Sequence, residues 1–101
     1  MVKGYNNEYN IVYIACHESA INLNFKITEE SLTEGIIEFK IGMSLFSYGE
    51  KFKIVITKIN ASSTRVEVGS KVAASIQFID WGKNKNNINS FFETLTELLK
   101  K

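Results

Sequence analysis

The chain has 101 residues, the size of one folding domain, and its 45% apolar and 23% charged residues are typical of a globular protein and exclude a disordered one. A net charge of +1, with Arg65 as the only arginine, argues against a dedicated nucleic-acid-binding protein. Cys16 is the only cysteine, which fits a reducing compartment, and no apolar run reaches the roughly 20 residues that span a membrane. We therefore expect a single cytoplasmic domain over residues 1–101.

The first predicted element is a helix over about residues 7–22, with Asn6 or Asn7 as its N-cap and Glu8 in its first turn. Apolar and small residues recur there at spacings of three and four, which predicts one buried face: Ile11, Val12, Ala15, Cys16, Ser19, Ala20 and Leu23. The alternative is a strand over residues 11–15, because this stretch is rich in residues that favour β-structure.

From Asn24 onward the apolar period changes to two, which predicts four strands over about residues 24–30, 36–43, 51–59 and 64–72. The residues expected to face the core are Phe25, Ile27, Ile37, Phe39, Ile41, Met43, Phe52, Ile54, Ile56, Val66, Val68, Ser70 and Val72. The opposite face is expected to be solvated, and it carries Glu38, Lys40, Lys51, Lys53, Arg65 and Glu67. Short polar turns join these strands, which indicates an antiparallel sheet.

A second helix is predicted over residues 80–101, with Asp80 as its N-cap and Lys100 and Lys101 at its C-terminal end. Its apolar stripe is Ile88, Phe91, Phe92, Leu95, Leu98 and Leu99, and Trp81 lies one heptad earlier. The stripe and the apolar face of the sheet need each other for burial. The predicted fold is therefore α+β in two layers: an antiparallel sheet of about four strands, in the order helix, strands, helix, packed on a long C-terminal helix.

Few residues carry the chemistry of an enzyme or a metal site. Cys16 and His17 are neighbours that diverge by about 100° on a helix, so they do not form a nucleophile and base pair, and we expect a packed cysteine beside a solvent-edge histidine. Asp80 is the only aspartate, and Glu93 and Glu97 lie on the polar face of the last helix, where carboxylates are solvated. The sequence predicts no catalytic residues, no metal ligands and no cofactor.

Two segments are unusual for connecting loops. Residues 44–50 (SLFSYGE) join two strands, yet they carry the aromatic residues Phe46 and Tyr48, which either meet a partner or fold back over the end of the core. Residues 80–87 (DWGKNKNN) place Lys83 and Lys85 at a helix N-terminus, which is either an anion site or a capped helix start with solvated lysines. Trp81 in this segment is either a core anchor or a stacking platform.

Together, residues 44–50 and 80–88 resemble a family of small bacterial domains of unknown function. In that family a serine-rich aromatic turn ending in Gly-Glu precedes a pair of strands, and an Asp-Trp-Gly-Lys-Asn element opens the last helix. The resemblance covers most of the chain and implies the fold but no activity; Tyr48 stands where the family more often has tryptophan. At a greater distance, the order of elements is similar to a reduced helix-grip (START-like) domain, which implies an apolar ligand held between sheet and helix.

The function expected from these features is a small, non-catalytic binding or interaction module. Its predicted contact residues are Phe46, Tyr48, Trp81, Lys83 and Lys85, and its partner is a protein or a small apolar ligand. The alternatives are a carrier of a small apolar ligand and a homo-oligomeric structural domain with a two-fold interface. An enzyme is the class that the residues support least.

Overall fold

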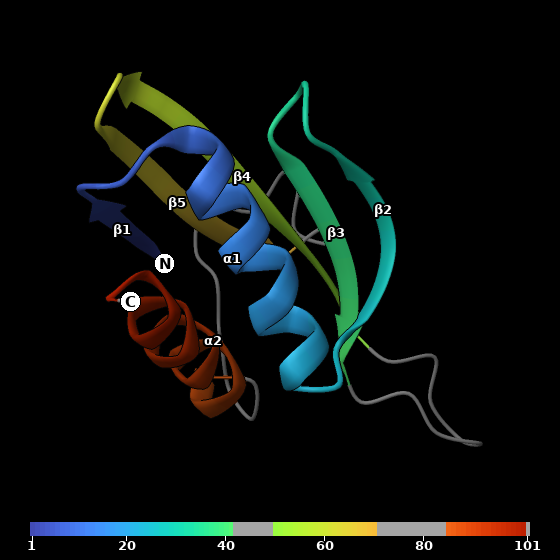
Figure 1. Ribbon diagram of the computed structural model, residues 1–101. Coiled ribbons are helices and arrows are strands. Elements are labelled where there is room, and N and C mark those ends of the chain that lie inside the picture. The colour runs from blue at the N-terminus through green and yellow to red at the C-terminus, as the bar shows by residue number, and fades with distance from the viewer. Residues whose placement is uncertain (42–49, 71–84, 101) are drawn as a thin grey trace.

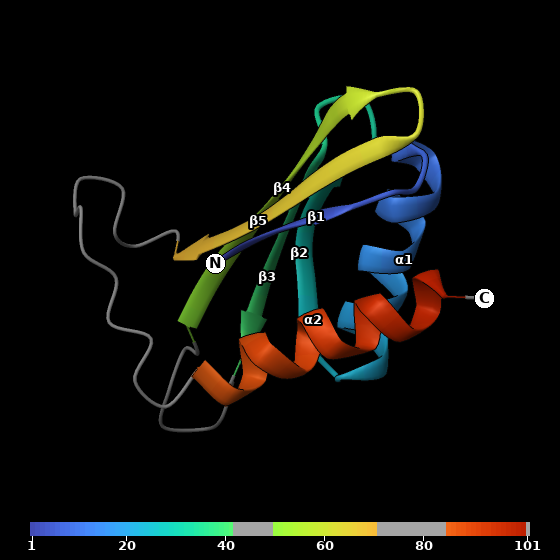
Figure 2. The same ribbon diagram turned by 90° about the vertical axis from the view of Figure 1, so that its left-hand side faces the viewer.

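The computed structural model describes residues 1–41, 50–70 and 85–100. Within them, an antiparallel sheet of five strands carries two helices on one face (Figure 1), and the same arrangement is seen from the side in Figure 2. The elements follow in the order β1 (Val2–Tyr5), α1 (Tyr9–Asn22), β2 (Lys26–Ser31), β3 (Ile36–Ile41), β4 (Glu50–Asn60), β5 (Ser63–Ser70) and α2 (Lys85–Leu99). The strand order β1-β5-β4-β3-β2 makes β1 and β2 the two edges of the sheet. The predicted α+β class with a C-terminal helix is confirmed.

The prediction of four strands is wrong by one, because β1 precedes the first helix. β1 pairs with β5 from Val2 opposite Glu67 to Tyr5 opposite Thr64. Only Tyr5 of its four residues is buried, so the strand lacks the alternating apolar pattern that indicates a half-buried strand. The phenol oxygen of Tyr5 lies 3.1 Å from Oγ1 of Thr96, so β1 also ties the edge of the sheet to α2.

α1 confirms the predicted helix and excludes the alternative strand, but its N-cap was wrongly predicted. The N-cap position is Glu8, and no side chain caps the helix there. Asn6 and Asn7 lie before that position, and the carbonyl oxygen of Asn7 accepts a hydrogen bond from Oγ1 of Thr64 at 2.8 Å. The residue before the helix is thus held by β5 and does not cap the helix with its side chain.

The C-terminal end of α1 directs the next residue into the core. Asn24 adopts a φ of 61°, the left-handed conformation that asparagine tolerates after a helix. The N–H groups of Asn24 and Phe25 donate to the carbonyl oxygens of Ile21 at 3.0 Å and Ala20 at 2.9 Å. This turn closes the helix and buries Phe25 against the sheet.

The conformations of two short turns depend on one residue each. Gly35 has a φ of 71°, and a Cβ there would meet the carbonyl oxygen of Ile56 and the phenol oxygen of Tyr9, so the β2–β3 turn needs glycine. The predicted turn between β4 and β5 is confirmed: Oδ1 of Asn60 accepts the N–H of Ser62 at 2.9 Å, which is an Asx turn.

The predicted alternation of the central strands is confirmed. The buried residues of β3, β4 and β5 include Ile37, Phe39, Ile41, Phe52, Ile54, Ile56, Val66 and Val68. The residues between them face away from the helices and are exposed or half-buried: Glu38, Lys40, Lys51, Lys53, Arg65 and Glu67. Met43 and Val72, which were also expected in strands, lie outside the described residues.

α2 buries most of its predicted stripe. Its fully packed residues are Ile88, Phe91, Phe92 and Leu95, while Leu98 and Leu99 pack against the core in part. The described helix runs over Lys85–Leu99, and the predicted ends, Asp80 with the neighbouring Trp81 and Lys101, lie outside the described residues. Within the described residues, neither helix is long and apolar enough to cross a membrane.

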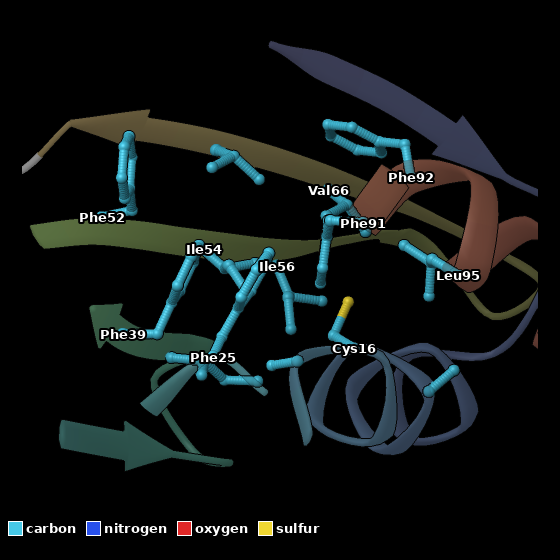
Figure 3. Packing of buried hydrophobic residues seen from close by; sticks show 14 of the residues in the cluster. Cys16, Phe25, Phe39, Phe52, Ile54, Ile56, Val66, Phe91, Phe92 and Leu95 are labelled. Carbon is cyan, nitrogen blue, oxygen red and sulfur yellow. The ribbon is translucent and has the colours of Figure 1, made fainter. Parts of the chain in front are cut away.

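Phe39 on β3 is fully buried and packs among other aromatic rings of the core (Figure 3). Its ring centroid is 5.1 Å from that of Phe25, 5.6 Å from that of Phe52 and 6.4 Å from that of Phe91, all in stacked orientations. The first of these rings follows α1, the second belongs to β4 and the third to α2. One side chain therefore joins β3 to β4, to the residue before β2 and to α2.

We predict that Phe39→Ala lowers the free energy of unfolding by about 3–5 kcal/mol, because it removes a fully buried ring and leaves a cavity between three others. Urea denaturation followed by circular dichroism measures this loss. The matched control is Ile36→Ala, on the half-buried outer face of the same strand, for which we expect a clearly smaller loss. Equal losses for the two variants would contradict the central place of Phe39.

Candidate interaction surface

Most of the contact residues predicted from sequence lie outside the described part of the chain. Phe46, Tyr48, Trp81 and Lys83 belong to residues 42–49 and 71–84, which the structure does not describe. Lys85 is the first residue of α2 and is exposed. The contacts predicted for these residues therefore stay predictions.

Cys16 and His17 lie where the sequence predicted. Cys16 is fully buried under the sheet, and burial raises the pKa of its thiol, so the thiol is protonated at neutral pH. His17 lies on the flank of α1, and its Nδ1 is 3.1 Å from Oε2 of Glu30, with about 39% of its side chain exposed. Nothing in this geometry joins the two side chains into one site.

Glu30 on β2 holds the flank of α1. Its Oε1 accepts a hydrogen bond from the phenol O–H of Tyr13 at 3.0 Å, while its Oε2 pairs with His17. Both partners are on the same side of α1, one turn apart, so a single carboxylate ties the flank of the helix to the edge of the sheet. Among the described residues, no group of three or more His, Cys, Asp or Glu side chains is placed to hold a metal ion.

An open hollow of about 560 Å³ lies between β1 and α2, and its lining residues are Lys3, Asn89, Phe92, Glu93, Thr96 and Glu97. Nζ of Lys3 donates to Oγ1 of Thr96 at 3.2 Å. Glu93 and Glu97 are exposed, as the sequence predicted for the polar face of this helix. The hollow is a surface feature with charges of both signs, and no pair of carboxylates faces an enclosed cleft there.

The outer face of the sheet is solvated and carries charges of both signs. Lys40 lies opposite Lys26 on one side and Lys51 on the other, and in the next row Glu38 lies opposite Lys53. The residues that point outward from the described strands include no aromatic ring, which surfaces for single-stranded nucleic acids use for stacking. This face has neither a uniform charge nor an apolar patch of rings.

The face of α1 that points away from the sheet carries exposed apolar side chains. Ile11, Ile14 and Ile21 are 50%, 56% and 52% exposed, and they form one stripe along the side of the helix that points away from the sheet. Glu18 lies within this line and is also exposed. Figure 1 and Figure 2 agree that no other described helix or strand lies over this side of α1. We call these four residues the isoleucine stripe.

The isoleucine stripe corrects one prediction from sequence. Ile11 was expected on the buried face, but that face consists of Val12, Tyr13, Ala15, Cys16, Ser19 and Ala20. α1 is therefore apolar on two opposite faces, a pattern typical of a helix that is covered on both sides. The signal was present in the spacing of Ile11, Ile14 and Ile21, but spacing alone does not tell which of two apolar faces the sheet covers.

Comparisons with known proteins assign no family. No protein-family model matches the chain, and no curated protein sequence matches it. The resemblance of residues 44–50 and 80–88 to a bacterial family, and the remoter likeness to helix-grip domains, stay predictions from sequence.

We predict that the stability of the protein falls between pH 10 and about 12, in part through Tyr13. Burial, and then the hydrogen bond and charge of Glu30, raise the pKa of Tyr13 from its usual 10 to about 12. In that interval the unfolded chain loses the phenol proton while the folded protein keeps it, so unfolding becomes easier as the pH rises. Tyr13→Phe should flatten this part of the profile, measured by urea denaturation at each pH.

The control is Tyr9→Phe. The phenol of Tyr9 donates to the carbonyl oxygen of Leu32 at 2.6 Å, and no carboxylate of the described residues is hydrogen-bonded to it. The pKa of Tyr9 is also raised, by burial alone, so this variant should change the profile less than Tyr13→Phe. If Tyr13→Phe kept the slope of the unchanged protein between pH 10 and 12, Tyr13 would not be held by Glu30 as described.

Proposed function

We propose that this protein is a small, non-catalytic interaction module that binds a protein partner through the isoleucine stripe of α1. The observation that supports the proposal is the exposure of three isoleucines on one helix face. Isoleucines scattered singly over a surface need no explanation, but an aligned set on the face opposite the core is typical of a protein-binding surface.

The stripe is held on a rigid support. The face of α1 opposite the stripe packs into the core through Val12, Cys16 and Ala20, which are fully buried. Glu30 binds the flank of the helix. A binding surface on a helix that is already ordered loses little conformational entropy when a partner docks. Cys16 is a free thiol within this support, which fits the reducing, cytoplasmic setting that we include in the proposal.

The packing of the core favours surface binding over storage of an apolar ligand. In a helix-grip carrier the ligand lies between sheet and helix, but here stacked rings of Phe25, Phe39, Phe52 and Phe91 lie in that space. The hollows that described residues line, such as the one beside Lys3, are open to the surface. The predicted contacts at Phe46, Tyr48, Trp81, Lys83 and Lys85 remain part of the proposed module, as additional contact residues.

We predict that Ile11→Gln, Ile14→Gln and Ile21→Gln each change the free energy of unfolding by no more than about 0.5 kcal/mol, because these side chains are half exposed and lie off the core. Thermal or urea denaturation measures the change. A loss as large as that of Phe39→Ala would show that the stripe is structural and would contradict the proposal.

The test of binding uses a photoreactive benzoylphenylalanine in place of Ile14, introduced into the protein in its own cells. We expect a discrete cross-linked product with another protein, which mass spectrometry identifies. The matched control places the same group at Ile59, an isoleucine of β4 that is 56% exposed and lies off α1. The same products at both positions, or none at Ile14, would overturn the proposal.

A further inference from the structure

We infer that the partner of the isoleucine stripe is an amphipathic helix with a basic side chain, lysine or arginine, among its apolar residues. This inference rests on the proposed function and adds the chemistry of the partner. It follows from the spacing of the stripe and from the carboxylate within it.

The spacing of the stripe fits a helix. Ile11, Ile14, Glu18 and Ile21 follow one another at intervals of three, four and three residues, the a/d spacing of a helix that packs along another helix. From Ile11 to Ile21 the stripe is about 15 Å long at 1.5 Å per residue, or roughly three turns. A partner helix of similar length would cover it, with its own apolar residues between the isoleucines.

Glu18 sets the charge that the partner must carry. It lies between Ile14 and Ile21 in the stripe, and no cation of the described chain is within ion-pair distance of it. A partner that covers the stripe removes water from this carboxylate, and an unpaired carboxylate in such an interface is costly. A lysine or arginine opposite Glu18 turns this cost into a specific contact.

Glu18 alone specifies the charge of the partner, because the other glutamates near α1 have neighbours or face away. Glu8 lies at the start of α1, where Lys58 of β4 lines the same hollow. Glu30 lies along the flank of α1 and pairs with His17. Glu29 lies on the outward face of the sheet, opposite Glu38.

Glu18 also argues against two other partners for the stripe, a second copy of this chain and a membrane surface. In an antiparallel pair of identical helices centred on the stripe, Glu18 lies opposite the second copy's Ile14, and in a parallel pair it lies opposite the second copy's Glu18. Neither arrangement supplies a cation. A membrane surface that attracts proteins through anionic lipids would repel the carboxylate of Glu18.

The experiment measures fluorescence anisotropy of labelled synthetic peptides with the whole protein. One probe is a leucine–lysine amphipathic helix of four turns, the second is the leucine–glutamate helix of the same spacing, and the third is a leucine–lysine peptide of scrambled order. We expect the first peptide to bind about tenfold more tightly than the second, because the charge opposite Glu18 changes sign. The scrambled peptide should bind more weakly than the first, because it has no apolar face.

Variants assign the effect to the stripe. Glu18→Lys should reverse the preference between the lysine and glutamate peptides, and the triple variant Ile11→Gln, Ile14→Gln, Ile21→Gln should lose binding of both. Ile59→Gln is the matched control and should bind as the unchanged protein does. Circular dichroism verifies that each variant is folded.

The inference would be overturned by equal binding of the two amphipathic peptides, by a preference that survives Glu18→Lys, or by a dimer in sedimentation that the triple variant dissociates. Binding to phosphatidylglycerol vesicles through the stripe would also overturn it, in favour of a membrane surface. The photo-cross-link at Ile14 separates this failure from failure of the proposed function. If the cross-linked partner had no basic helix, the proposed interaction module would stand. Only the basic, helical chemistry that we assign to the partner would be wrong.

Discussion

Phe39 lies on the inner face of the sheet, and its ring stacks on rings from three other segments of the chain. Its stacking partners precede β2, belong to β4 and belong to α2, so the three contacts form together only when the sheet and α2 are in place. An aromatic side chain buries a large apolar area, and offset or stacked rings add a further stabilisation. The rest of the structure depends on this cluster because it is where the two layers meet.

The position of α1 follows from contacts at its end and along its flank. The left-handed residue Asn24 ends the helix so that Phe25 enters the aromatic cluster, and Glu30 binds Tyr13 and His17 on the β2 side. Together they set the rotation of α1 about its own axis. With that rotation, the face containing Cys16 is buried and the isoleucine stripe points to solvent.

The same rotation connects packing to the proposed function. A helix that is apolar on two faces does not settle on one orientation through hydrophobic burial alone, since both faces gain from contact with the sheet. The polar contacts of Glu30 and the turn at Asn24 favour one of the two. The isoleucine stripe is then left for a partner, and Glu18 within it specifies the charge of that partner.

The sequence by itself determined the elements with a clear period. The alternation in β3, β4 and β5, the Asn60 turn and the apolar stripe of α2 are local patterns, and all of them are present in the structure within the described residues. The sequence also placed Cys16 in the core and His17 at its edge. Local geometry decides such features, because successive side chains alternate in a strand and rotate by about 100° in a helix.

Only the tertiary structure decided the rest. β1 has too few apolar residues to show a period, and it exists because β5 offers an unpaired edge whose hydrogen-bonding groups it satisfies. The buried face of α1, and with it the exposure of Ile11, was set by contacts with residues of other elements, such as Glu30. Spacing along a chain describes which residues share a face; which of two apolar faces is buried depends on the elements that pack against it.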